Sequence, residues 1–402
     1  MEINENRTIL GNIEQAIFCV ILVVYGLNLF NRYFYISYAV IAICFAYIII
    51  RHKIYASWQT LFTFGFLVIY WLLAYFTNGE AKTELIIECL AFYTFGAIAY
   101  LLAENKHQDT FKLVLSGAFG FGVYGIISSF SAVLDSGRYM QDIWGGGRIA
   151  ATQVAGWCMI FMATVPWIIF KGKEIKLWNR TALYIAAALS IVSFFILSSR
   201  TGLIVSVVIA LLVFYLAIKN KQSRIVIGLI GLFVIGLAAF VFDIGGIQTT
   251  FWNSNLILRM IQKQNTLGSA FDTGRTERWI YVISHFDEHM GGGYYYSKQL
   301  GGYIHNFFLD LYDECGIFAL CAMTPFLIRL LVGLFKLQKR NIDIADRIGL
   351  IAWFAVIAIL FMTEPVLYYG RTNLMAFFFF MAGIVEFSGA LAYKEEHLSD
   401  AR

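Results

Sequence analysis

Residues 203–218 read LIVSVVIALLVFYLAI, a stretch that contains no charged side chain. A second uncharged stretch, IVIGLIGLFVIGLAAFVF, occupies 225–242, and the basic segment KNKQSR (219–224) separates the two. A helix needs roughly 20 apolar residues to cross the hydrocarbon core of a bilayer, about twice the length of a barrel strand. Because backbone amides inside lipid need internal partners, the two stretches predict neighbouring transmembrane helices joined by a short basic turn.

The same pattern extends over the whole chain. Hydrophobic residues make up 59% of the 402 positions and charged residues 14%, whereas charge usually approaches about a quarter of a soluble domain. We therefore expect an all-α polytopic membrane protein with a single transmembrane domain covering residues 1–402. Twelve membrane spans are expected near residues 12–30, 33–50, 57–76, 85–102, 111–134, 153–170, 181–198, 203–218, 225–242, 307–334, 348–366 and 374–392.

Basic residues predict the orientation of these spans. With a cytoplasmic N-terminus, the inner side receives RHK (51–53), KGKEIK (171–176), KNKQSR (219–224) and KLQKR (336–340). Cytoplasmic loops of membrane proteins are enriched in Lys and Arg, so we expect both termini in the cytoplasm. No small-residue cleavage site follows the first apolar run, which favours a retained first span over a signal peptide.

The basic residues expected on the outer side are mostly arginines. The planar guanidinium group suits bidentate contact with carboxylate or phosphate, which indicates an anionic ligand on this side. Arginines that only extend to the bilayer interface are the alternative interpretation. The outer arginines are Arg32, Arg138, Arg148, Arg200, Arg259, Arg275, Arg278 and Arg371.

One outer loop is much longer than the others and runs from about Asp243 to His305, between the ninth and tenth expected spans. Long loops in compact proteins commonly carry function. Its stretch 275–287 predicts a short amphipathic helix before GGG at 291–293. The apolar side of this helix is expected to comprise Trp279, Ile280, Ile283 and Phe286.

Three arginines are candidate ligands for an anion. Arg200 stands in SSRTG at the border of a span, where a charge is costly unless it meets an anion or water. Arg275 and Arg278 are three residues apart and would share one side of a helix, where they could bind a diphosphate. As an alternative, Arg200 only marks the end of a membrane span. The alternative for the other two arginines is a solvated surface on which they form salt bridges with Glu277.

The segment HNFFLDLYDECG (305–316) begins with the histidine that we consider a candidate general base. Asp310, Asp313 and Glu314 follow at helical spacing and are expected on a common stripe, with Asn306 beside the histidine. Carboxylates can orient an imidazole or serve as the base themselves. A structural, hydrogen-bonding role for His305 is the alternative.

Two further arginines are expected at the same membrane level as Arg200. Arg148 closes GGGR before the sixth span, and Arg371 lies in EPVLYYGRTN (364–373), the last outer loop. Together they suggest a ring of guanidinium groups around one cavity.

HFDEH (285–289) matches the spelling of one zinc-peptidase motif. Three fixed letters without a third ligand do not indicate zinc, so we expect no metal and no cofactor.

Taken together, SSRTG, an arginine before an aromatic-rich helix, GGG and HNxxLxxxxExG resemble the superfamily of O-antigen ligases and O-antigen or capsule polymerases. This resemblance implies a membrane glycosyltransferase fold of the C type in the bacterial inner membrane. It implies an active site on the extracytoplasmic side. Carried over by motif, it assigns roles in transfer to Arg200, Arg275, His305, Glu314 and Arg371, and it matches Arg148 only loosely. With the residue patterns described above, we predict catalysis by His305 and Glu314. We predict substrate binding by Arg148, Arg200, Arg275, Arg278, Asn306, Asp310 and Arg371.

The resemblance also implies a substrate, an oligosaccharide on undecaprenyl pyrophosphate. We expect a polymerase that adds glycan to a lipid-linked repeat unit with inversion and without a metal. The alternatives are a ligase acting on lipid A core or another terminal acceptor, a polysaccharide or lipid transporter, and a non-catalytic scaffold. Membrane lipids and a chain-length regulator protein are the expected partners, and no nucleic acid is expected.

Overall fold

The computed structural model confirms the helical membrane class. It describes residues 2–29, 35–50, 58–78, 83–104, 110–132, 139–145, 147–254, 256–258, 260–261, 274–338, 344–364 and 373–386. Among these residues, eight helices are long and apolar enough to cross a membrane. Four shorter apolar helices are Asn12–Gly26, Tyr38–Ile50, Leu61–Thr77 and Asn373–Glu386. The expected number of twelve spans therefore stays a prediction.

The chain forms two compact units. Unit 1 comprises Met1–Gly120, Arg275–Asp343 and Leu360–Arg402, and unit 2 comprises Phe121–Gly274 and Ile344–Ile359.

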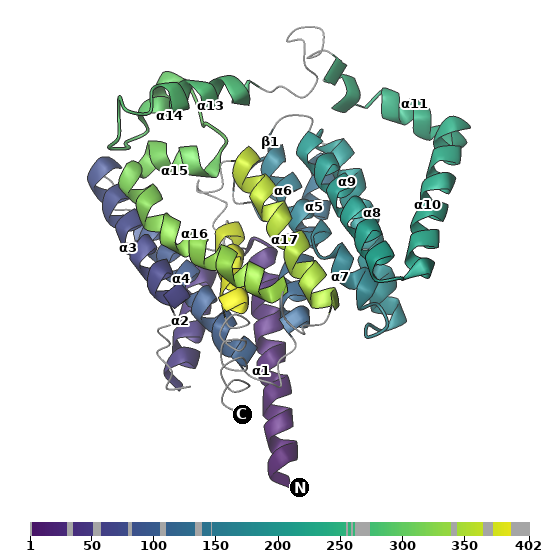
Figure 1. Cartoon of the computed structure of the whole chain (residues 1–402), viewed down its shortest axis with the longest axis horizontal. Coiled ribbons are helices and arrows are strands. Elements are labelled where there is room, and N and C mark those ends of the chain that lie inside the picture. Colours follow the sequence, from purple (N-terminus) through teal and green to yellow (C-terminus); the bar gives the residue numbers. More distant parts are fainter. Residues whose placement is uncertain are drawn as a thin grey trace. The chain divides into compact units, whose positions relative to one another are not determined.

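Unit 1 is built around α3 and α16. Its complete elements are α1 (Glu2–Gly26), α2 (Tyr35–Ile50), α3 (Trp58–Asn78), α4 (Thr83–Glu104), α13 (Arg275–Ser284), α14 (Tyr295–Gln299), α15 (Phe307–Cys315), α16 (Ile317–Gln338) and the helix Asn373–Glu386. Helix α3 contacts α4, α15 and α16, and α14 contacts α15 (Figure 1). The short helices of the long loop therefore lie at one end of the unit 1 helices.

Unit 2 is built around α6. Its complete elements are β1 (Tyr139–Gln141), β2 (Arg148–Ala150), α6 (Ala151–Met162), α7 (Val165–Phe170), α8 (Leu177–Ile196), α9 (Arg200–Lys219), α10 (Ser223–Val241), η2 (Ile244–Gly246) and α11 (Ile247–Trp252). Helix α6 contacts α8 and α9, and α9 contacts α10. The chain order α8, α9, α10 agrees with the consecutive apolar runs of the sequence.

Helices α5 (Thr110–Ala132) and α17 (Ile344–Thr363) each contribute residues to both units. In unit 2, Asp346 near the start of α17 accepts hydrogen bonds from the Trp167 indole at 3.0 Å and from Lys171 at 2.9 Å. The indole of Trp167 also covers the backbone of Gly349, where a Cβ atom would lie 1.9 Å from the ring. This part of α17 is therefore fixed against α7.

The sequence patterns did not predict a small β-hairpin in unit 2. β1 and β2 pair in antiparallel register, with Gln141 opposite Arg148. Asp142 accepts hydrogen bonds from the Tyr124 hydroxyl at 2.7 Å and from the Trp144 amide at 3.1 Å. A buried carboxylate thus holds the glycine-rich turn that precedes Arg148.

The expected span 307–334 is wrong in its boundaries. Gly316 has a φ of +78° and separates α15 from α16, and the helix of membrane-crossing length begins at Ile317. A left-handed residue cannot continue a right-handed helix. Asp310, Asp313 and Glu314 therefore lie on a separate short helix, α15, and His305 lies just before it.

Candidate functional site

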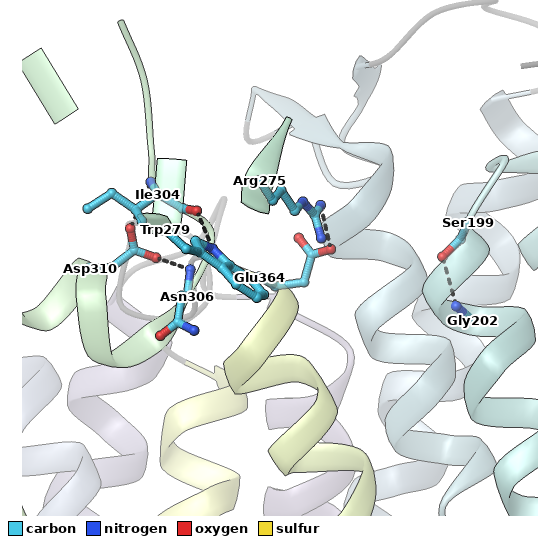
Figure 2. A network of polar contacts seen from close by, with 8 residues as sticks. All are labelled: Ser199, Gly202, Arg275, Trp279, Ile304, Asn306, Asp310 and Glu364. Atoms are coloured by element: carbon cyan, nitrogen blue, oxygen red, sulfur yellow. Dashed lines mark hydrogen bonds and ion pairs between the residues drawn. The ribbon is translucent and has the colours of Figure 1, made fainter. Parts of the chain in front are cut away.

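The candidate site in unit 1 begins with the contact between α13 and the segment 303–306. Nη1 of Arg278 donates to the carbonyl oxygen of Tyr303 at 2.6 Å. Nε1 of Trp279 donates to the carbonyl oxygen of Ile304 at 3.0 Å (Figure 2). Two consecutive residues of α13 thus hold two consecutive carbonyl groups immediately before His305.

The predicted helix 275–287 exists as α13, but its expected apolar side is partly wrong. Val282 is fully buried and packs in one cluster with Tyr296, Ile304 and Tyr312. Ile280 and Ile283, expected inside, are 60% and 63% exposed. Trp279 and Phe286 do pack against the cluster, as expected. The loop therefore carries a small hydrophobic core of its own, which fixes α13 against α14 and α15.

His305 lies between α14 and α15 in an unusual backbone conformation. Its φ is +63°, in the left-handed region, and its side chain is half-buried. The next residue, Asn306, is extended and caps α15, because its Oδ1 accepts from the amides of Phe308 at 3.1 Å and Leu309 at 3.3 Å. The chain therefore turns sharply at the histidine and enters α15 directly afterwards.

The three acids of α15 are all buried, but they serve different contacts. Asp310 accepts from the amides of Ile304 at 3.0 Å and Asn306 at 3.1 Å. Asp313 accepts from the amides of Tyr296 at 2.7 Å and Ser297 at 3.1 Å, at the start of α14. Glu314 accepts from the hydroxyl of Tyr70 on α3 at 3.3 Å. These side chains thus connect α15 to three different parts of unit 1.

Glu314 combines burial with a raised proton affinity. It is 7% exposed and lies on α15, outside the membrane-length helices. Burial raises the pKa of Glu314 to about 7, although hydrogen bonds from the hydroxyls of Tyr294 and Tyr70 lower it. Near neutral pH this carboxyl group can therefore both accept and release a proton.

Replacing Glu314 with glutamine should change how stability depends on pH. The folded chain holds this proton more tightly than the unfolded chain, so stability should fall as pH rises from 4.5 through about 7. The full difference corresponds to about 3 kcal/mol. We expect E314Q to melt at a higher temperature than the parent protein at pH 8 in detergent, and at a similar temperature at pH 4.5. If E314Q and the parent protein differed in melting temperature by the same amount at both pH values, the raised pKa of Glu314 would be wrong.

Arg275 forms an ion pair that the sequence did not predict. Its Nη2 lies 3.3 Å from Oε1 of Glu364, and the side chains are 20% and 3% exposed (Figure 2). Glu364 follows the end of α17 and belongs to unit 1. The first residue of α13 therefore brings a guanidinium group to a buried carboxylate, and one turn later the same helix contacts the backbone immediately before His305.

Comparison with protein families finds a match in this chain. Residues 185–324 match the family model described as O-antigen ligase. This match over about a third of the chain supports a resemblance to the O-antigen ligase and polymerase superfamily. A comparison with curated proteins finds no match. The predicted resemblance is thus confirmed, and members of this superfamily are membrane transferases of the glycosyltransferase kind.

The segment that matches the O-antigen ligase model contains most of the candidate residues. These are Arg200, Arg275, Arg278, His305, Asn306, Asp310 and Glu314. Arg148 and Glu364 lie outside the matched segment, and Arg371 lies outside the described residues. No role for any of these residues follows from the match itself, so their functions remain predictions.

Two of the predicted arginines belong to unit 2. Arg200 is the first residue of α9, behind the N-cap Ser199, whose hydroxyl accepts from the amide of Gly202 at 3.1 Å (Figure 2). Gly202 packs against Phe194, and a Cβ atom there would lie 2.3 Å from that ring. SSRTG thus forms a tight turn between α8 and α9. Arg148 is exposed on β2. That these arginines converge with the unit 1 residues stays a prediction.

HFDEH lies after α13, and its two histidines make local contacts. Nδ1 of His285 lies 2.8 Å from the carbonyl oxygen of Tyr281, and the ring of His289 stacks on Tyr295 with centroids 4.6 Å apart. Both histidines thus contribute to the structure of the loop.

Proposed function

We propose that this membrane protein is a polysaccharide polymerase of the O-antigen and capsule type. It would transfer the growing glycan from undecaprenyl pyrophosphate to a lipid-linked repeat unit at the outer leaflet of the inner membrane. The observation that carries the proposal is the set of contacts that α13 makes. Its Arg275 pairs with Glu364, and its Arg278 and Trp279 donate to the two carbonyl groups immediately before His305. A guanidinium group and an imidazole on neighbouring segments suit transfer of a group from a pyrophosphate.

The proposed reaction exchanges one bond at the anomeric carbon for another. The hydroxyl group of the acceptor sugar attacks that carbon, its proton passes to His305, and the bond to the phosphate oxygen breaks. Attack from the side opposite the leaving group inverts the anomeric configuration. The departing lipid pyrophosphate gains negative charge, which preorganised guanidinium groups such as that of Arg275 stabilise in a partly dry site. A metal is not needed for this role.

A ligase would use the same donor and the same chemistry, and the matching family model is compatible with both enzymes. The two differ in the acceptor. Purified protein given only lipid-linked repeat units should form a ladder of longer glycans if it is a polymerase. Product that appears only after addition of lipid A core would establish a ligase instead. Failure to transfer glycan to either acceptor would contradict both enzymes and favour the transporter.

Arg275 offers a test with a matched control in the same unit. Arg329 also pairs with a buried glutamate, Glu386, at 3.0 Å, so replacing either arginine leaves one buried carboxylate without its cation. Because Arg329 contacts Glu386 through two nitrogens and Arg275 contacts Glu364 through one, we expect Arg329→Met to lower the melting temperature at least as much as Arg275→Met. Only Arg275→Met should slow ladder formation, by roughly 10²- to 10³-fold, because it removes stabilisation of the leaving group. Equal activity of the two variants would argue against a role of Arg275 in transfer.

A further inference from the structure

Asp310 holds the backbone on both sides of His305. Its side chain is fully buried, and its two oxygens accept from the amides of Ile304 and Asn306, the residues before and after the histidine (Figure 2). Hydrogen bonds from a backbone amide to a carboxylate are stronger than those between neutral groups. One carboxylate therefore fixes both neighbours of the candidate base.

This restraint acts on a segment that would not keep its conformation by itself. His305 has a φ of +63°, which residues with a Cβ atom rarely adopt. The same segment is also held by the indole of Trp279 on the Ile304 carbonyl and by the side chain of Asn306 on the first turn of α15. Such a concentration of contacts on one turn determines where the imidazole projects.

We infer that Asp310 is a positioning residue for His305, acting through the backbone, and neither a ligand of the substrate nor the base. The inference rests on the proposed function for the role of the imidazole. Since Asp310 has no exposed surface and its two oxygens bind backbone amides, the substrate would have to displace these contacts to reach it. A shift of about 1 Å in a reacting group can cost on the order of 10²-fold in rate.

Asp313 provides a closely matched control on the same helix. It too is a buried aspartate whose side chain accepts from two backbone amides, those of Tyr296 and Ser297. These amides lie at the start of α14 and not beside His305. Asparagine at either position keeps the size of the side chain and replaces one acceptor oxygen with a donor. Asp310→Asn and Asp313→Asn should therefore lower the melting temperature by similar amounts.

The activity of the two variants should differ. We expect Asp310→Asn to lower kcat for glycan transfer by about 10- to 100-fold with little change in KM for the lipid-linked donor. Asp313→Asn should keep kcat within about threefold of the parent value. Equal losses of kcat in both variants would mean that Asp310 only stabilises the fold, and the inference would be wrong.

A double-mutant cycle separates this inference from the proposed function. In a His305→Gly background, Asp310→Asn should cause no further loss of kcat, because no imidazole remains to be positioned. An additive loss would overturn the inference. If His305→Gly retains full activity, the proposed base is wrong; if it loses activity while Asp310→Asn does not, only the positioning role is wrong.

Trp279→Phe supplies a second route if Asp310→Asn does not fold. Phenylalanine keeps an aromatic ring in the cluster of the loop but cannot donate to the Ile304 carbonyl. We expect Trp279→Phe to lower kcat less than Asp310→Asn does. In the His305→Gly background, Trp279→Phe should cause no further loss of kcat. A loss that persists unchanged in the His305→Gly background would contradict control of the imidazole through this segment.

Discussion

Alanine at Gly316 is expected to destabilise the protein severely. Gly316 has a φ of +78°, and a Cβ atom there would lie 2.3 Å from the carbonyl oxygen of Met290. Gly292, with a φ of +81°, faces it, and a Cβ atom there would lie 2.7 Å from the amide nitrogen of Gly316. The two backbones thus touch where neither can carry a side chain. Around this contact, the amide of Gly293 donates to the backbone carbonyl of Glu314, and the amide of Ile317 donates to the backbone carbonyl of Met290.

Each alanine should combine a disfavoured backbone conformation with a clash against main-chain atoms. We estimate a cost of about 3–5 kcal/mol for Gly316→Ala or Gly292→Ala, a large share of the roughly 5–15 kcal/mol that stabilises a folded domain. The yield of monodisperse protein in detergent and its melting temperature measure the effect.

Gly291 supplies the control for these substitutions. It precedes Gly292 in the same GGG stretch, its φ is not in the left-handed region, and a Cβ atom there would meet nothing within 4 Å. Gly291→Ala should therefore fold and melt like the parent protein. If Gly316→Ala folded and melted equally well, the backbone contact would not have the importance that we give it.

The glycines also show what the sequence could and could not predict. GGG and DECG both carried the resemblance, because each is a recognisable local pattern. That they contact each other could not be read from the pattern, since the contact depends on how the intervening α14 and the histidine segment fold. The apolar runs were easier to interpret, because a bilayer requires long uninterrupted apolar helices. The strands of the 139–150 hairpin have three residues each and gave no comparable signal.

The candidate site was predictable as residues but not as contacts. His305 and the acids of α15 stood out because they are polar groups at the border of an apolar run. Tyr70 is 244 residues from Glu314, and Glu364 is 89 residues from Arg275, so only the packing of unit 1 reveals these pairs. The exposure of Ile280 and Ile283 was missed for a related reason. Helical spacing shows which residues of α13 share a side, but it does not show which side is buried by the rest of the protein.

Removing the imidazole of His305 should slow glycan transfer by about as much as the loss of a general base usually does. Glycine is the informative replacement, because it adopts the φ of +63° without the penalty of a Cβ atom and so preserves the turn before α15. We expect His305→Gly to slow glycan transfer by about 10²- to 10⁴-fold while the melting temperature stays close to that of the parent protein.

Added imidazole should restore part of the activity of His305→Gly, and the restored rate should grow with the neutral fraction of the added base. This rescue distinguishes a lost base from a damaged binding site, which a small molecule could not repair. His289→Gly removes an exposed histidine from the same loop and should retain full activity with or without imidazole. A His305→Gly protein that is folded and fully active would leave Glu314 as the candidate base. A His305→Gly protein that is folded, inactive and not rescued by imidazole would indicate that His305 binds the substrate. Free imidazole can accept a proton, but it cannot hold the substrate in the position that the fixed ring provides.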